Sequence, residues 1–241
     1  MSTGLFLAIR FLTRLPTPPV RADEADFAAS MRWFPAAGLA IGACLAAAGW
    51  VGGLVDPWVG ALAVLVAWVW ITGALHLDGL ADIHDAFGAV HKGPDRLRAV
   101  LADPHVGSFG VVAIVLQLMA KLVLLYALLK HDGGALALLL IPFAARIGPL
   151  LWTRWLPPLH AGLGARFRGA VRPVDLALWM LALAVAAWFL PALLCAPIGM
   201  ALWGWRLRRT LGGISGDGHG AGIELVETGL LLAVLVMSAA R

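Results

Sequence analysis

Long apolar runs separated by polar segments dominate this chain, and none of them alternates in the manner of a strand. Several runs reach the roughly 20 residues that an α-helix needs to cross a bilayer. Region 176–205 carries Pro191 near its middle and is too long for one ordinary span, so we expect two short helices that meet there. The pattern therefore predicts seven spans, or six if that region crosses only once. The runs cover residues 34–55, 58–77, 109–129, 135–152, 176–205 and 221–240.

Residues 3–17 show a different pattern, in which Arg10 and Arg14 fall on one helical face and apolar side chains cover the rest. Such a pattern is typical of a helix that lies in the membrane interface, here ended by Pro16 and the Pro18-Pro19 pair. We expect the two arginines to contact lipid headgroups. Contact with an anionic substrate is the alternative.

Composition supports the membrane assignment. The 241 residues are 61% hydrophobic and 13% charged, with a mean hydropathy of +0.88, whereas soluble domains carry about 25% charged residues. Continuously apolar segments argue against a membrane barrel. We therefore expect one integral membrane domain over residues 1–241, an all-α polytopic transmembrane helix bundle with about seven spans and an N-terminal interfacial helix.

The distribution of positive charge predicts the orientation of the bundle. With seven spans, the N-terminus and loops 78–108, 153–175 and 206–220 share one side, which holds 14 of the 18 lysines and arginines. The positive-inside rule places that side in the cytoplasm. The net charge of +4 thus reflects topology, and no nucleic-acid partner is expected. Cys44 and Cys195 lie inside apolar runs, which favours neither a disulfide nor a thiolate metal site.

Three carboxylates follow the apolar run 58–77. Asp78, Asp82 and Asp85 are spaced i, i+4 and i+7, which places them within a sector of roughly 60° on one helical face. Like charges this close repel each other unless a cation lies among them, and oxygen ligands favour Mg²⁺ or Mn²⁺. Asp103 is a further candidate ligand. The alternative is a solvated first turn of a loop helix.

A glycine-rich segment, residues 212–220, contains Asp217 and leads into a helix that bears Glu224 and Glu227. We expect the backbone amides at Gly212, Gly213 and Gly216 to approach phosphate closely, because no Cβ obstructs them. Asp217 and Glu224 share a face if the last helix starts early. The alternative is a flexible loop between two spans.

Two basic residues, Lys121 and Arg146, lie within predicted spans, where a charge is costly and usually has a partner. We expect both to form ion pairs with the acidic cluster. Arg166, in the basic loop, either clamps phosphate or faces lipid headgroups. Clustered carboxylates, a glycine-rich loop and arginines are the ingredients of metal-assisted phosphoryl transfer. A cation transporter would also need carboxylates within its spans, whereas the three aspartates cluster where a predicted span ends.

The chain resembles the cobalamin synthase (adenosylcobinamide-GDP ribazoletransferase) family over nearly its whole length. The resemblance rests on FLTRLPTP (11–18), Phe34-Pro35, HLDGLADIHD (76–85), the 103–110 segment, Arg146 and LGGISGDGHGAGIELVE (211–227). Two positions depart from the family pattern. The loop DPHVG (103–107) lacks the Ser-Arg run that is common there, which removes any basic role for this loop, and Ala86-Phe87 stands where a glycine is frequent.

The resemblance implies a reaction at the bacterial inner (cytoplasmic) membrane, with the site facing the cytoplasm. Adenosylcobinamide-GDP is joined to the 5′-hydroxyl of α-ribazole, or to α-ribazole 5′-phosphate, and GMP is released. We expect Asp78, Asp82, Asp85 and Asp217, with Asp103 as a candidate, to hold Mg²⁺, for which Mn²⁺ is a possible substitute. Asp85 or Asp217 takes the hydroxyl proton, and Arg146, Lys121 and Arg166 offset phosphate charge. A weaker similarity links the aspartates to CDP-alcohol phosphotransferases. A transporter for a divalent cation or a corrinoid is the alternative.

Overall fold

The computed structural model describes residues 2–93, 100–101, 103, 105–130, 134–159 and 163–239. Arg96 and Arg98, which contributed to the predicted cytoplasmic charge, lie outside the described residues, as does the expected end of the last span at Ala240. Within the described part, the chain is helical and forms only one isolated β-bridge, between Pro158 and Ile214. The predicted all-α fold is therefore confirmed.

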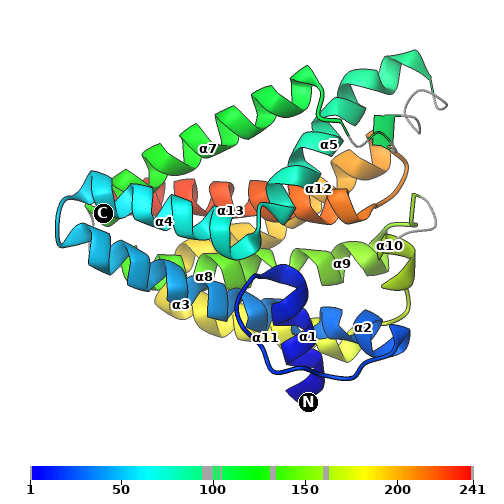
Figure 1. Cartoon of the computed structure of the whole chain (residues 1–241), viewed down its shortest axis with the longest axis horizontal. Coiled ribbons are helices and arrows are strands. Elements are labelled where there is room, and N and C mark those ends of the chain that lie inside the picture. The colour runs from blue at the N-terminus through cyan, green and yellow to red at the C-terminus, as the bar shows by residue number, and fades with distance from the viewer. Residues whose placement is uncertain are drawn as a thin grey trace.

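The helices are arranged around one central helix at the C-terminus (Figure 1). This helix, α13, packs against α5, α7 and α8, while α3 packs tightly against α8 and α4. The elements in chain order are α1 (Ser2–Leu12), α2 (Glu24–Ser30), η1 (Met31–Trp33), α3 (Phe34–Gly53), α4 (Pro57–Thr72), α5 (Leu75–Ala89), η2 (Val90–Lys92), α7 (Ser108–Leu129), α8 (Gly134–Ala145), α9 (Gly148–Trp155), α10 (Leu163–Arg166), α11 (Pro173–Phe189), η3 (Pro191–Cys195), α12 (Ala196–Thr210) and α13 (Gly216–Ala239).

The outer surface of the bundle is apolar, as a lipid-facing surface requires. Trp70 is 72% exposed, Leu116 is 61% exposed and Trp188 is 85% exposed. A water-soluble monomer rarely displays apolar patches of this extent. Inside the bundle, Gly42 of α3 lies directly on the α8 backbone at Leu139, which leaves no room for a Cβ. Close helix packing of this kind is typical of membrane bundles.

Four stretches in the described part of the chain are long and apolar enough to cross a membrane: Glu24–Gly53, Ser108–Leu129, Gly134–Trp155 and Gly216–Ala239. These correspond to the predicted first, third, fourth and last spans, with ends that differ by a few residues or more. A fifth arises if the bent pair α4 and α5 counts as one span. Region 176–205 divides into α11 and α12 around Pro191, as predicted, although α11 alone is shorter than these spans. The count of seven spans stays a prediction.

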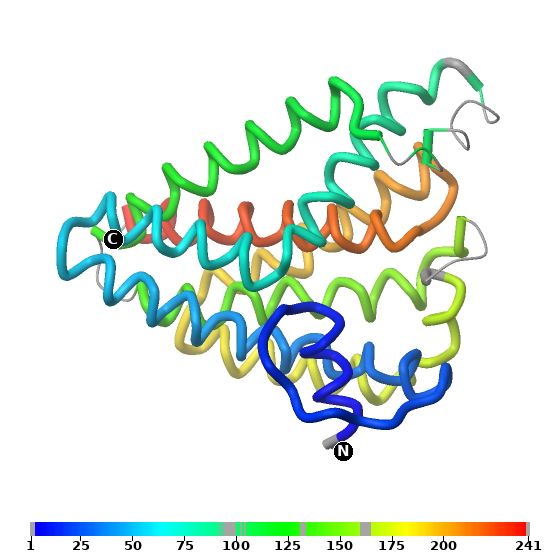
Figure 2. Tube along the Cα trace, in the orientation of Figure 1, coloured from blue at the N-terminus to red at the C-terminus, as the bar shows by residue number. Residues whose placement is uncertain are grey.

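The predicted second span, 58–77, is wrong as a continuous helix. α4 ends at Thr72, and α5 leaves it at an angle of 83°. Figure 2 shows this bend. Apolar composition continues across the break through Ala74 and Leu75, so hydropathy alone does not detect it. The last span also starts earlier than predicted, at Gly216 instead of near Ala221.

The N-terminal helix is shorter than predicted, since α1 ends at Leu12 and not at Pro16. Its apolar face packs on the protein: Ala8 and Leu12 are buried in a cluster with Phe34, Leu150 and Phe167. Arg10 and Arg14 remain exposed. The interfacial position of this helix stays a prediction.

Candidate functional site

The bend between α4 and α5 positions the aspartate helix. Gly73 and Ala74 both adopt left-handed backbone conformations, each with φ of 61°, which glycine tolerates and alanine adopts only when the surroundings enforce it. The backbone N–H of Arg14 donates to the carbonyl of Ile71 at 2.7 Å. A Cβ on Gly73 would lie 2.5 Å from Arg14 Nε. The FLTRLPTP segment therefore packs on the bend between α4 and α5.

Asp85, the last of the three aspartates on α5, holds the start of α7. Its Oδ2 accepts a hydrogen bond from the Gly107 backbone N–H at 2.7 Å, and its Oδ1 accepts one from Gly110 at 2.9 Å. A Cβ at either glycine would lie 2.5 Å from these oxygens. A carboxylate at a helix N-terminus is favoured by the helix dipole. Both oxygens of Asp85 thus have backbone donors, a structural role that the spacing of the aspartates does not reveal.

The crossing of α5 and α13 brings the glycine-rich motif to the aspartates. At Gly79, an added Cβ would lie 2.8 Å from both Cα and O of Asp217, so the two backbones are in direct contact. The negative charges of Asp217, Asp78 and Asp85 all act on Asp82. Two sequence blocks that are far apart in the chain therefore share one acidic site. Within the described ranges, no three His, Cys, Asp or Glu side chains are arranged as a ready-made metal site.

The start of α13 shapes this site. The Ser215 hydroxyl accepts a hydrogen bond from the Gly218 N–H at 3.1 Å and donates to Asp217 Oδ2 at 3.3 Å. Asp217 is therefore in the first turn of a helix and not in a loop. Gly216, predicted as a loop residue, is the first residue of that helix. Since α13 starts early, Asp217, Glu224 and Glu227 lie along one helical face.

Lys121 and Arg146 have buried partners on this face of α13. Lys121 Nζ lies 2.7 Å from both Glu224 Oε2 and Glu227 Oε2, and Arg146 Nη1 lies 2.8 Å from Glu227 Oε1. The two basic residues are 2% and 0% exposed. Both expected ion pairs are therefore present, but their acidic partners are the glutamates two and three turns further along α13 than Asp217, and not the aspartates of α5. The four charges cancel, as burial requires.

Neutral groups extend this buried network in both directions. Gln117 Nε2 donates to Glu224 Oε2 at 2.8 Å, and the Lys121 ammonium lies 4.2 Å from the centre of the Trp68 ring. Arg146 Nη1 also donates to the Pro142 carbonyl at 2.9 Å, where α8 ends. His76 Nδ1 lies 3.5 Å from Arg146 Nη2. Because His76 and Asp78 are neighbours on α5, the network reaches the edge of the acidic site.

A cavity of about 90 Å³ opens beside Asp78 and Asp217. It lies between the N-terminal segment, α5, α9, the turn after α10, and α13. Its walls are mainly apolar, apart from these two carboxylates and two histidines. The lining residues are Phe11, Leu12, Met31, Phe34, Leu75, His76, Asp78, Pro149, Phe167, Gly216, Asp217, His219, Gly220 and Ile223.

The family model described as cobalamin-5-phosphate synthase matches residues 4–235 of this chain. Several relatives carry the name adenosylcobinamide-GDP ribazoletransferase. The relative from Novosphingobium aromaticivorans is 66% identical over 237 residues, which cover 97% of this chain and 96% of the relative. Those from Laribacter hongkongensis and Brevibacillus brevis are 54% and 35% identical, covering 97% and 95% of this chain and 96% of each relative. The chain belongs to the cobalamin-5-phosphate synthase family.

The match confirms the resemblance found in the sequence, and it spans every motif on which that resemblance rested. No solved structure matches the chain, so the geometry of the site comes from the present structure alone. Both family blocks, 76–85 and 211–227, meet at the α5–α13 crossing.

The other residues predicted for the site are Gly212, Gly213, Arg166 and Asp103. Gly212 has φ of 84° and open space around it, whereas Gly213 is buried against the Pro157 carbonyl. Packing therefore explains Gly213 without a bound phosphate. Arg166 is exposed and lies 3.8 Å from Glu24. Asp103 accepts hydrogen bonds from the backbone N–H and the ring Nδ1 of His105, at 3.0 and 2.8 Å.

Sequence reasoning missed the two cavity histidines. His76 and His219 are 2% and 6% exposed, and in each ring one nitrogen has no hydrogen-bond partner. Each histidine lies inside one of the two family motifs, two residues from an aspartate, His76 from Asp78 and His219 from Asp217. This position in the sequence could have indicated them. The aromatic wall of the cavity comes from three separate segments, so no local pattern indicated it.

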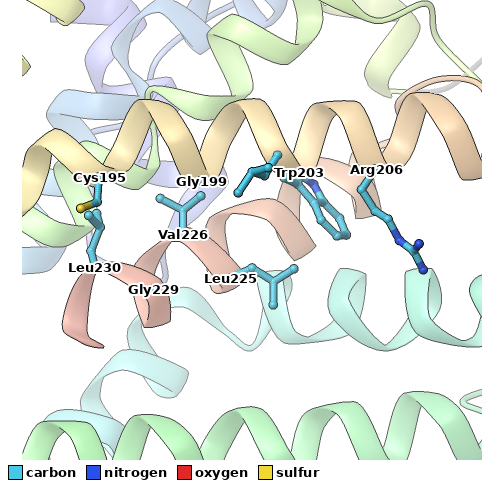
Figure 3. A pocket seen from close by; sticks show the side chains of 9 residues that line it. Cys195, Gly199, Trp203, Arg206, Leu225, Val226, Gly229 and Leu230 are labelled. Carbon is cyan, nitrogen blue, oxygen red and sulfur yellow. The ribbon is translucent and has the colours of Figure 1, made fainter. Parts of the chain in front are cut away.

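Two further pockets lie away from the aspartates. One, about 380 Å³, is lined by apolar residues of α12 and α13, with Trp203 and Arg206 at one end (Figure 3). The other, about 750 Å³, lies among α5, α7, α12 and α13 and includes Phe109 and Gln117. Neither is lined by Asp78 or Asp217, so the acidic site belongs to the smaller cavity.

Proposed function

We propose that this chain is an adenosylcobinamide-GDP ribazoletransferase, which joins adenosylcobinamide-GDP to α-ribazole or its phosphate and releases GMP. The observation that carries the proposal is the contact of Gly79 with Asp217, because it unites the carboxylates of both family motifs at one cavity. Membership of the family and the names of the relatives support the substrate assignment.

The residues present fit a magnesium ion. Mg²⁺ commonly uses one or two protein carboxylates and completes its shell with water and substrate phosphates, so it needs no complete protein cage. Asp78 and Asp217 line the same cavity, and Asp82 lies within the field of both. These three would hold the ion. When bound, Mg²⁺ neutralises the diphosphate and stabilises the leaving GMP.

The protein groups divide the remaining tasks. We assign the acceptor proton to the Asp217 carboxylate, because Asp217 lines the cavity and Asp85 is engaged at the start of α7. The acceptor oxygen bonds to the phosphorus nearest cobinamide, the bridging P–O bond of the diphosphate breaks, and GMP leaves with the bridging oxygen. Lys121 and Arg146 hold α13 in place through Glu227 and so position Asp217.

The two acceptors constrain which hydroxyl attacks. The 5′-hydroxyl expected from the resemblance is free only in α-ribazole itself, because α-ribazole 5′-phosphate carries a phosphate on that oxygen. The family description, cobalamin-5-phosphate synthase, names a product that retains a 5-phosphate. We therefore assign the attack to a secondary ribose hydroxyl for α-ribazole 5′-phosphate, and to the same hydroxyl for α-ribazole, because one site presents the same oxygen of both acceptors to the phosphorus.

The site opens to the cytoplasm of a bacterial inner membrane in this proposal. Arg206, Arg208 and Arg209 end α12 directly before the glycine-rich motif, and such clusters remain on the cytoplasmic side of a membrane. The exposed apolar surface of the bundle supports the membrane location.

Release of GMP tests the proposal. Purified protein in detergent is incubated with adenosylcobinamide-GDP, α-ribazole and Mg²⁺, and GMP is measured by chromatography. We expect GMP in the complete mixture, loss of GMP with EDTA, and recovery with Mg²⁺ or Mn²⁺ better than with Ca²⁺, whose longer bonds fit a compact diphosphate poorly. Absence of GMP, together with gradient-driven flux of a divalent cation or corrinoid in vesicles, would establish the transporter alternative instead.

A further inference from the structure

The cavity beside Asp78 and Asp217 has an aromatic wall. The ring centres of Phe11 and Phe34 are 5.8 Å apart, those of Phe34 and Phe167 are 5.9 Å apart, and those of Phe11 and Phe167 are 6.1 Å apart. Each ring packs on the other two, which fixes the wall before any ligand arrives. Such a surface favours a flat, apolar ring system.

Besides Asp78 and Asp217, two buried imidazoles are polar groups that line this cavity. His219 Nε2 lies 3.3 Å from the Thr153 hydroxyl, and its Nδ1 has no partner. His76 Nδ1 faces Arg146, and its Nε2 has no partner. A buried ring nitrogen without a partner is costly, so a ligand with a matching polar atom stabilises the site. The Thr153 hydroxyl also lies 3.4 Å from Met31 Sδ, so its proton has two acceptors within reach. In the neutral tautomer of His219 that carries its proton on Nδ1, Nε2 accepts from Thr153 and the Nδ1–H is available to a ligand acceptor.

We propose that this cavity binds the benzimidazole base of α-ribazole. The inference rests on the function proposed above and assigns one of its substrates to a place. The dimethylbenzimidazole base is flat and apolar, and after attachment to ribose it has a single unsubstituted ring nitrogen, which accepts one hydrogen bond. The aromatic wall matches the flat apolar face of the base, and one imidazole N–H matches its single acceptor nitrogen.

The other parts of the two substrates fit this cavity poorly. Guanine has several donors along its edge that need acceptors, and the carboxylates of this cavity, Asp78 and Asp217, are assigned above to magnesium. Its N–H groups would then be buried against a mainly apolar lining without partners, at a substantial cost in free energy. The corrinoid ring is far too large for about 90 Å³. With the base against the aromatic wall, the ribose would extend toward the part of the lining formed by Asp217, the residue assigned above to accept the hydroxyl proton.

Equilibrium binding of α-ribazole, measured by calorimetry on the purified full-length protein, tests the assignment without requiring turnover. Phe34→Leu shortens the wall, and His219→Asn removes the ring that faces the ligand. We expect each substitution to raise the Kd for α-ribazole about tenfold, the effect of losing one well-packed contact. The KM for α-ribazole rises in parallel, while the KM for adenosylcobinamide-GDP stays unchanged.

Phe27→Leu is the matched control. The Phe27 ring packs on Phe11 and Phe167, with centres 5.2 and 5.6 Å apart, but it is not among the described residues that line the cavity. It loosens the same aromatic cluster without changing the wall, so its Kd should match wild type. Guanosine should not compete with α-ribazole in any of these proteins.

The outcomes separate this inference from the proposed function. An unchanged Kd in both cavity variants, competition by guanosine, a rise in the KM for adenosylcobinamide-GDP alone, or no binding of α-ribazole by wild type overturns the cavity assignment. GMP release by wild type decides the function independently. Binding that is lost in the cavity variants, without any GMP from wild type, would support the cavity and refute the transferase.

Discussion

The Gly79–Asp217 contact offers the sharpest test of how the site is assembled. In Gly79→Ala, the new Cβ would lie 2.8 Å from the Asp217 backbone, whereas ordinary contacts begin at about 3.4 Å. Neither neighbouring atom belongs to a flexible side chain, so α5 and α13 must separate by roughly 0.6 Å or more. This displacement moves Asp78 and Asp82 away from Asp217.

The expected loss follows from that displacement. A misplacement of about 1 Å at a reacting centre costs about a hundredfold in rate, so we expect kcat for GMP release to fall about 10- to 100-fold. Overpacking costs about 1–3 kcal/mol of stability, offset by about 0.5–1 kcal/mol because alanine is the better helix former. The melting temperature should therefore fall only modestly, and the variant should still insert into the membrane.

A glycine on the partner helix, α13, provides the control. Gly229 has no atom within 4 Å of an added Cβ, so Gly229→Ala should keep wild-type kcat and gain slightly in stability. A Gly79→Ala protein with kcat within twofold of wild type would refute the reasoning. Equal losses in Gly79→Ala and Gly229→Ala would show that the crossing is not the cause.

Three further perturbations follow from the site. Asp82→Asn keeps the size of the side chain but removes a charge, so turnover should fall by orders of magnitude at saturating Mg²⁺ without loss of folded protein, and near wild-type turnover would remove Asp82 from the site. Glu227→Gln leaves Arg146 without its carboxylate partner and should destabilise the protein by about 3–5 kcal/mol, measured as a lower melting temperature in detergent; an unchanged melting temperature would contradict this. Ser108→Cys and Arg209→Cys are both at exposed positions and are placed in a cysteine-free background. Both cysteines should react with a membrane-impermeant reagent added on the cytoplasmic side. Labelling of the two from opposite sides would contradict a site shared by both sequence blocks.

The order of apolar and polar residues determined the fold class and much of the helix plan. Apolar runs of span length produce helices because the backbone must satisfy its own hydrogen bonds in lipid. The break at Pro191 was also predictable, because proline lacks the N–H that a helix interior requires. The three aspartates do share one helix, α5, as their spacing indicated, and the motifs that carried the family resemblance contain the residues that meet at the site.

Only the tertiary structure decided which of these residues meet, and how. The bend at Gly73 and Ala74 depends on the N-terminal segment packed against it, and no window of local sequence contains both partners. The same limit applies to Lys121, whose carboxylate partners lie on α13 and not on α5. Hydrophobic periodicity specifies the buried face of a helix, but the choice of facing helix depends on packing across the whole bundle. For that reason the sequence indicated the chemistry of the acidic site, while the structure revealed its aromatic cavity and the engagement of Asp85 at the start of α7.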